Sequence, residues 1–138
     1  MGDLAVVNGK VAAVGKISGD AKKVVDAKGK VVVPGGIDVH THFDMPFMGA
    51  TTIDTFSTGS TAAACGGTTS IVDFAIQKKG ETLRGALDDW HKRADGKCAV
   101  DYGFHMIVTD FPEKQAKEMD KLVGEGIAGA GRPSMGST

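Results

Sequence analysis

Apolar segments of two kinds alternate through the middle of the chain, and this alternation limits the folds that it can adopt. Short β-branched segments predict strands, and longer segments with apolar residues at helical spacing predict helices. In chain order we expect a strand over 37–41, a helix over 53–65, a strand over 69–74, a helix over 81–95, a strand over 100–108 and a helix that begins at Pro112. Such alternation favours a parallel sheet with right-handed crossovers. Three units do not close an eight-stranded barrel, so the sequence predicts an α/β fold that begins a longer one.

Two of the predicted helices have an apolar face. In the helix over 81–95 this face comprises Leu83, Leu87, Trp90 and Ala94, and in the helix after Pro112 it comprises Ala116, Met119 and Val123. Residues at these spacings lie on one side of an α-helix, so we expect both sets to pack against the sheet. Residues 45–52, which precede the first helix, are expected to form a loop.

The N-terminal part of the chain predicts a smaller β unit. Asn8-Gly9 separates two valine-containing segments, which is a strong signal for a hairpin with a two-residue turn. A second turn over 26–30 lies between Val24-Val25 and residues 31–33, so a second pair of strands is expected. About 30 residues are too few to bury a core of their own.

These patterns divide the chain into three parts. Residues 1–34 are interpreted as part of a small antiparallel β domain, and residues 35–127 as the first part of the main α/β domain. Residues 128–138 contain Gly, Ala, Ser and a proline where a fourth strand is due, so we expect an atypical, disordered tail.

Charge and composition exclude several classes of protein. The net charge is −1, so the chain has no basic surplus that would favour nucleic acid. No apolar run approaches the roughly 20 residues of a membrane span, and the N-terminus does not resemble a signal peptide. Cys65 and Cys98 have no metal-binding spacing, and we interpret them as the reduced thiols of a cytoplasmic protein.

His40-Thr41-His42 is the central chemical feature of the sequence. Residues i and i+2 of a strand point to the same face, so both imidazoles are expected to project together at the C-terminal end of the first parallel strand. Functional residues of α/β folds gather at that end. Two imidazoles at this spacing can bind one metal ion, but taken alone they are also compatible with ordinary hydrogen-bonded histidines.

Three other polar residues near the predicted strands have simpler interpretations. Asp38 precedes the histidine pair by two residues, where it can either orient a metal ligand or bond to the backbone. Asp73 lies at the end of the second predicted strand, and a structural role is favoured over a place in the pocket. His105 lies within an apolar strand and is expected to be a hydrogen-bonded core histidine.

Three segments carry a resemblance to a known family. Residues 26–49, which include Pro34-Gly35-Gly36-Ile37-Asp38 and the histidine pair, resemble the N-terminal signature of the amidohydrolase superfamily. The loop 45–49, the segment 66–74 and the segment 101–105 resemble the dihydropyrimidinase/hydantoinase family within it. The resemblance covers residues 4–127. It implies that the α/β part is the first three βα units of a TIM-type (β/α)8 barrel.

The resemblance also implies an activity. Members of this family hydrolyse cyclic amides, opening a dihydropyrimidine or hydantoin ring to an N-carbamoyl amino acid with the help of two divalent metal ions, usually zinc. By resemblance His40 and His42 bind the first metal, and the segment 45–48 lines the substrate pocket through Met45 and Phe47. None of the catalytic residues falls within this chain. The intact family proteins are homotetramers in the cytoplasm.

One departure from the family pattern sets a limit on this expectation. The bridging metal ligand of the family is a carboxylated lysine on the fourth strand, and its position falls here on Gly131, while Arg132 cannot form the carbamate. We therefore expect a fragment that is inactive alone, arising from truncation or a shifted reading frame. Alternatives are an allantoinase-type hydrolase, a non-catalytic half-barrel that associates with a full-length relative, and a metal-binding module unrelated to hydrolases.

Overall fold

The computed structural model describes residues 2–110, 112–127 and 130–131. The chain divides into two compact units, residues 1–33 and 34–138, which are described separately. Among the described helices, none combines the length and the apolar character that a membrane span requires.

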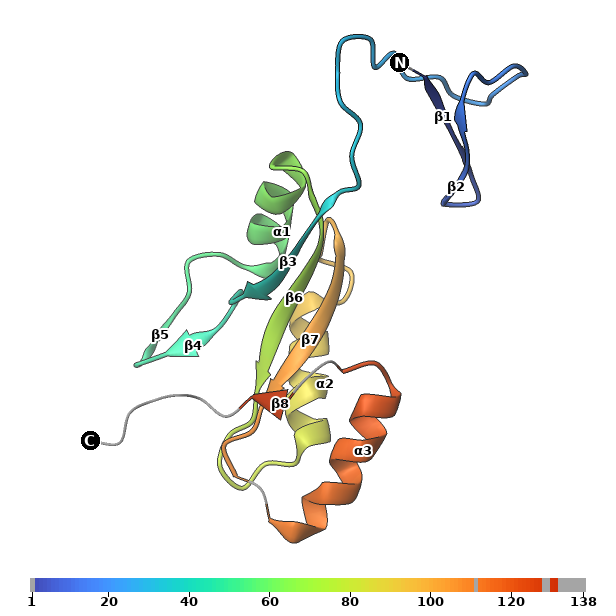
Figure 1. Cartoon of the computed structure of the whole chain (residues 1–138). Coiled ribbons are helices and arrows are strands. Elements are labelled where there is room, and N and C mark those ends of the chain that lie inside the picture. The colour runs from blue at the N-terminus through green and yellow to red at the C-terminus, as the bar shows by residue number, and fades with distance from the viewer. Residues whose placement is uncertain (1, 111, 128–129, 132–138) are drawn as a thin grey trace. The chain divides into compact units, whose positions relative to one another are not determined.

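The first unit contains the hairpin that the sequence predicts. Strand β1 (Asp3–Val7) pairs with β2 (Lys10–Gly15) in antiparallel orientation (Figure 1). The turn residues Asn8 and Gly9 both have positive φ, at 51° and 73°. Two consecutive positive φ values match the twist of the flanking strands, and Asn and Gly tolerate them best. The prediction of this hairpin is confirmed.

The second pair of strands predicted in this unit is wrong. Residues 16–35, all of which the structure describes, contain the expected turn but no strand; Lys30 N donates to the Ala27 carbonyl at 2.9 Å. The flanking valines are 61–87% exposed: Val24, Val25, Val31, Val32 and Val33. β-Branched side chains favour strands because they pack on a half-buried pleated surface, and the described part of this unit offers these valines no such surface.

The second unit is built on a parallel sheet, as the alternating pattern predicts. Its strands β3 (Gly36–Thr41), β6 (Thr68–Ile76), β7 (Asp101–Ile107) and β8 (Ala130–Gly131) lie in the order β3-β6-β7-β8. The connections carry helices α1 (Phe56–Cys65), α2 (Leu83–Ala94) and α3 (Ala116–Gly124), the last preceded by a 3₁₀ turn, η1 (Glu113–Gln115) (Figure 1). The α/β prediction with a parallel sheet is therefore confirmed.

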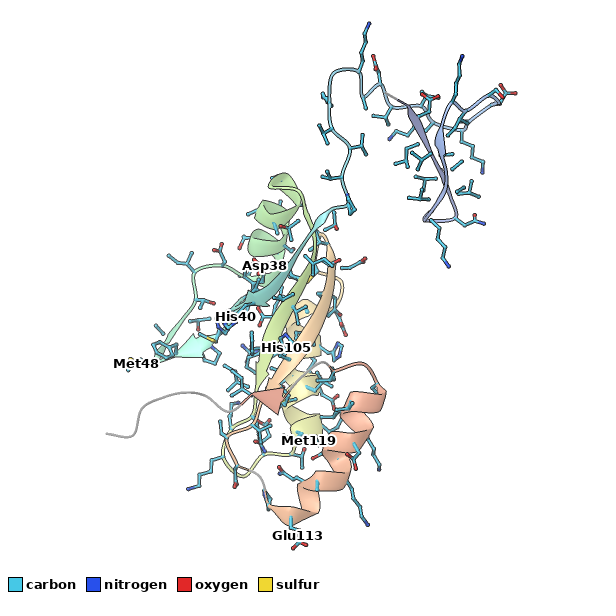
Figure 2. The ribbon with its side chains drawn as sticks, in the orientation of Figure 1. Asp38, His40, Met48, His105, Glu113 and Met119 are labelled. Atoms are coloured by element: carbon cyan, nitrogen blue, oxygen red, sulfur yellow. The ribbon has the colours of Figure 1, made fainter. Side chains whose placement is uncertain are left out.

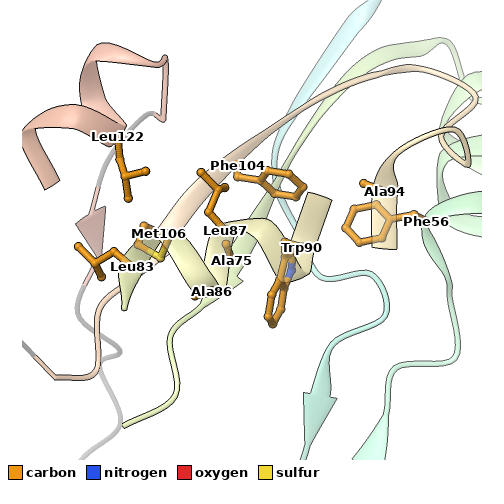
Figure 3. Close-up of a cluster of buried hydrophobic side chains, with 10 residues drawn as sticks. All are labelled: Phe56, Ala75, Leu83, Ala86, Leu87, Trp90, Ala94, Phe104, Met106 and Leu122. Carbon is orange, nitrogen blue, oxygen red and sulfur yellow. The ribbon is translucent and has the colours of Figure 1, made fainter. Parts of the chain in front are cut away.

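The hydrophobic core lies between the sheet and its helices. It comprises Phe56, Ala75, Leu83, Ala86, Leu87, Trp90, Ala94, Phe104, Met106 and Leu122 (Figure 3). All four residues predicted for the buried face of α2 are in this list. Thr82 caps α2 through a bond from Gly85 N to its side chain at 3.0 Å.

The buried face predicted for the last helix is wrong in two of three residues. Val123 is 61% exposed and Ala116 is exposed, whereas Leu122 is buried and Met119 is half-buried. The reason is that hydrogen bonds made by polar residues determine which face of this helix is buried. Glu118 accepts hydrogen bonds from the first backbone N–H groups of α2, and the buried Gln115 amide donates to the Glu81 carbonyl at 3.0 Å. A search for apolar periodicity does not count such residues.

The start of the predicted tail needs a correction. Ala130 and Gly131 pair in parallel with Met106 and Ile107 of β7, so these two residues begin a fourth strand instead of a linker. The edge of β7 offers backbone donors and acceptors that any residue can pair with, whatever its side chain. The other residues of the predicted tail, 128–129 and 132–138, lie outside the described residues.

Candidate metal centre

The structure brings the two histidines of the His-x-His segment together. His40 is the fifth residue of β3 and His42 follows the strand directly. Their Nε2 atoms are 3.2 Å apart, with the two rings nearly perpendicular at 88°. In Figure 2 the His40 side chain lies near the C-terminal end of β3. The predicted juxtaposition of the two side chains is present at the end of the sheet where α/β proteins place functional groups.

The geometry of the pair fits the binding of one metal ion. Two Zn–N bonds of about 2.0–2.1 Å at a tetrahedral angle place the two nitrogens about 3.3–3.4 Å apart, close to the observed separation. The same contact is a hydrogen bond when one ring carries its proton on Nε2. Among the described residues, no group of three or more His, Cys, Asp or Glu side chains is placed to hold a metal. The pair can therefore supply two of the four ligands of a tetrahedral site.

Phe74 and His105 share the face of the sheet that carries this pair. The Phe74 ring centroid lies 4.5 Å from that of His40, 5.1 Å from that of His42 and 5.0 Å from that of His105. His105 is half-buried and pairs with Phe74 across β6 and β7. The sequence predicts a core histidine at 105, but the residue lies on the opposite face from the helix-covered core residues Phe104 and Met106.

Asp73 supports the histidine segment from the helix-covered side of the sheet. The residue is fully buried, and its Oδ2 accepts bonds from Thr41 Oγ1 at 2.9 Å and from Phe43 N at 2.8 Å. Its Oδ1 accepts bonds from Phe74 N at 2.7 Å and Trp90 Nε1 at 3.3 Å. Burial raises the pKa of Asp73 above its ordinary value, and these four hydrogen bonds oppose that rise. The structural role that we favoured for Asp73 agrees with these contacts.

Asp38 acts on the backbone. Its Oδ1 accepts a hydrogen bond from His40 N at 3.1 Å. The carboxylate thus bonds to the main chain of the candidate ligand, which is the second of the two roles considered for it.

Residues 45–52 form a short hairpin instead of the expected loop. Strands β4 (Pro46–Phe47) and β5 (Ala50–Thr51) pair around Met48 and Gly49, which have φ values of 49° and 80°. Met45, one of the two predicted pocket residues, is half-buried at the base of the hairpin, and Phe47, the other, is 49% exposed. A hollow lined by residues 64, 68–69 and 98–101 lies at the opposite end of the sheet and contains neither of them.

Two residues that the sequence analysis missed hold the base of this hairpin. Arg93 Nη1 donates to the Asp44 carbonyl at 2.6 Å, and its guanidinium lies 4.7 Å from the centroid of the Trp90 ring. Asp44 has φ 49°, and its Oδ2 accepts a bond from Phe56 N at 2.9 Å, at the start of α1. The Arg93–Asp44 bond joins residues that are 49 positions apart, and the Phe56–Asp44 bond joins residues that are 12 positions apart. No local sequence pattern therefore reveals them.

Comparison with known proteins places the chain in a class. Residues 23–122 match the Amidohydrolase family. The chain therefore belongs to the amidohydrolase family, and the resemblance described above is confirmed.

The individual relatives are more specific. The chain is 53% identical over 131 residues to D-hydantoinase from Streptomyces coelicolor and 50% identical over 103 residues to dihydropyrimidinase from Dictyostelium discoideum, covering 91% and 75% of this chain. A crystal structure of D-hydantoinase superposes on 94% of the chain with a TM-score of 0.88 and 44% sequence identity. A crystal structure of dihydropyrimidinase from Brevibacillus agri also superposes on 94% of the chain, with a TM-score of 0.88 and 46% sequence identity. The chain covers 28%, 20%, 28% and 28% of these four proteins, respectively.

Proposed function

We propose that the protein to which these 138 residues belong hydrolyses cyclic amides, opening a dihydropyrimidine or hydantoin ring to an N-carbamoyl amino acid. The observation that carries this proposal is the convergence of His40 Nε2 and His42 Nε2 at 3.2 Å. The family match and the D-hydantoinase and dihydropyrimidinase relatives support the choice of reaction.

In this proposal His40 and His42 hold one of two divalent metal ions, most simply zinc. Such ions lower the pKa of a bound water and polarise the carbonyl under attack. Two imidazoles are half of a tetrahedral ligand set, so we expect the described residues alone to give no turnover. In this chain Asp38 accepts a bond from His40 N, and Asp73 accepts bonds from Thr41 Oγ1 and Phe43 N, on either side of His42.

The proposal assigns substrate recognition to the hairpin 45–52. A hydrophobic wall selects a ring substituent by its size, and Met45 and Phe47 are the candidates for that wall. Support comes from the bonds at the base of the hairpin, because Met45 N donates to Thr52 Oγ1 at 2.9 Å and Thr52 N donates to the Met45 carbonyl at 3.0 Å. A hairpin held in this way presents a defined surface.

We further propose the setting in which this site works. Residues 35–127 would form the first part of a (β/α)8 barrel, and residues 1–34 part of a small antiparallel β domain, in a cytoplasmic homotetramer. The parallel order β3-β6-β7-β8 supports the barrel, and the β1–β2 hairpin supports the β domain. Both described cysteines are free thiols, in keeping with a reducing compartment.

A chimera tests the proposed function. Residues 2–127 of this chain would replace the matching segment of the Streptomyces coelicolor D-hydantoinase, and the purified chimera would be assayed for bound metal and for hydrolysis of hydantoin and dihydrouracil. We expect both activities, and we expect His40→Ala to abolish them and to reduce the metal content. His91→Ala, which removes an imidazole on the helix side of the sheet, is the matched control. A folded, metal-loaded chimera without hydrolysis of either ring would refute the proposal.

A further inference from the structure

We propose that the adjacent residues Asp73 and Phe74 of β6 position His40 and His42 from opposite faces of the sheet, and so set how tightly the pair binds a divalent metal ion. The inference rests on the proposed function, which assigns the pair to a metal. Both residues are positioning residues, since they act through the imidazoles and their backbone and touch no substrate.

Asp73 bonds to the residues on both sides of His42. One carboxylate oxygen, Oδ2, accepts from the hydroxyl of Thr41, which lies between the two histidines, and from the N–H of Phe43, which follows them. The other oxygen is held by Phe74 N and Trp90 Nε1. Asp73 is fully buried and Thr41 is 8% exposed, so water does not compete well for these bonds.

The pairing of this stretch of β3 with β6 is irregular. The register between β3 and β6 shifts between Asp38 and Thr41, and pairing resumes at Thr41, opposite Asp73. His40 lies within this irregular stretch, where the strand pairing changes register. The carboxylates of Asp38 and Asp73 add bonds there, to His40 N and to the residues that flank His42.

Phe74 restrains the imidazole rings on the face of the sheet that carries them, opposite to Asp73. Its ring is tilted by 47° and 40° to the rings of His40 and His42, at centroid distances of 4.5 and 5.1 Å. Imidazole χ2 torsions are intrinsically broad, so a neighbouring ring is needed to keep both Nε2 atoms aimed at one point. His105 contacts Phe74 from β7 at 5.0 Å and limits the movement of the phenyl ring in turn.

Zinc binding by the 138-residue chain tests the inference. Affinity would be measured by competition with a chromophoric zinc chelator for the wild type, Thr41→Val, which removes the hydroxyl bonded to Asp73, and Phe74→Leu, which removes the ring. Loss of a ligand-orienting partner costs about 10- to 100-fold in metal affinity, and we expect a loss of that size in both variants. Phe74→Tyr, which keeps the ring, should bind like the wild type.

Matched controls separate positioning from general loss of stability. Thr109→Val removes a hydroxyl that donates to the Gln77 carbonyl at 2.8 Å, and Phe104→Leu removes a buried ring from the helix-covered core. Neither residue contacts the histidine pair, so we expect zinc affinities close to that of the wild type. Equal affinities for Phe74→Leu, Thr41→Val and their controls would refute the inference and leave the proposed metal centre intact.

A second measurement needs no metal. A phenyl ring at these distances shifts the imidazole proton resonances, so in NMR spectra of the metal-free chain Phe74→Leu should move the signals of His40, His42 and His105 together. Unchanged signals would refute the positioning of the rings. A wild-type chain that takes up no zinc would refute the metal centre itself, together with the proposed effect on metal affinity. The NMR result would still decide whether Phe74 orders the imidazole rings.

Discussion

Glu118 of α3 holds the N-terminus of α2, and its replacement gives a quantitative prediction. Its two carboxylate oxygens each accept a bond at 3.1 Å, from Leu83 N and from Arg84 N. Gly85 N bonds to the Thr82 side chain and Ala86 N to the Thr82 carbonyl. The N–H groups of Leu83, Arg84 and Gly85, which have no intrahelical partners, are thus satisfied by side chains, two of them by a residue 34 or 35 positions away.

The expected cost of Glu118→Ala follows from these contacts. A hydrogen bond to a charged group contributes about 1.5–3 kcal/mol, and loss of a helix N-cap costs about 0.5–2 kcal/mol. Glu118 is partly exposed, so water screens its charge, whereas Leu83 is fully buried, which keeps water from replacing the carboxylate at its N–H. We expect a loss of about 2 kcal/mol in the free energy of unfolding, and about half of that for Glu118→Gln.

Urea denaturation of the 138-residue chain, followed by the fluorescence of its single tryptophan, measures this loss. Trp90 lies in the core within α2, so its signal reports the helix that Glu118 caps. Asp120→Ala, at an exposed carboxylate of the same helix, is the control. A loss for Glu118→Ala no larger than that for Asp120→Ala would refute the assignment of the cap.

Three further predictions concern stability and titration. Burial, and after it the hydrogen bond to Asp95, raises the pKa of Tyr102 to about 12. The contribution of this tyrosine to stability is therefore complete below about pH 10 and is lost as the pH rises through 12. Absorbance titration of the single tyrosine measures this pKa. Gly59→Ala places a Cβ 2.1 Å from the Phe43 ring and should cost about 1–3 kcal/mol in urea denaturation. Gly9→Ala, at φ 73° in open space, should cost the hairpin about 1–2 kcal/mol, seen as weaker cross-strand NOEs.

Each of these predictions has a contradicting result. Asp95→Asn should lower the titration midpoint of Tyr102, and an unchanged midpoint would show that the carboxylate does not hold the phenol. Gly103→Ala, with nothing within 4 Å of the added Cβ, is the control for Gly59→Ala, and equal losses would contradict the clash with Phe43. Undiminished cross-strand NOEs in Gly9→Ala would contradict the conformational cost assigned to the turn.

Local sequence patterns were reliable where neighbouring residues decide the structure. The β–α alternation, the apolar face of α2 and the Asn8-Gly9 turn were all predictable, because helical spacing and positive φ are properties of a few consecutive residues. The convergence of His40 and His42 was predictable for the same reason, since residues i and i+2 of a strand share a face.

Local sequence patterns failed where a residue far away in the chain decides whether a segment pairs or which face it buries. The valines at 31–33 resemble a strand but find no partner among the described residues of their unit, whereas Ala130 and Gly131 resemble a linker and pair with β7. The face that α3 buries is selected by Glu118 and Gln115, through bonds to residues more than 30 positions away. Propensity describes what a segment tolerates, and pairing depends on what lies beside it.

The sequence by itself determined the alternation of strands and helices, the turn at Asn8-Gly9 and which two imidazoles face each other, because period and turn chemistry are local. Only the tertiary structure decided what holds those imidazoles in place. Asp73 and Phe74 are more than 30 positions from His40 and become its neighbours through the parallel crossover from β3 to β6, a connection that carries the whole of α1. Contacts made by chain crossover leave no periodic trace in the sequence, so the supports of the candidate metal centre emerge only after folding.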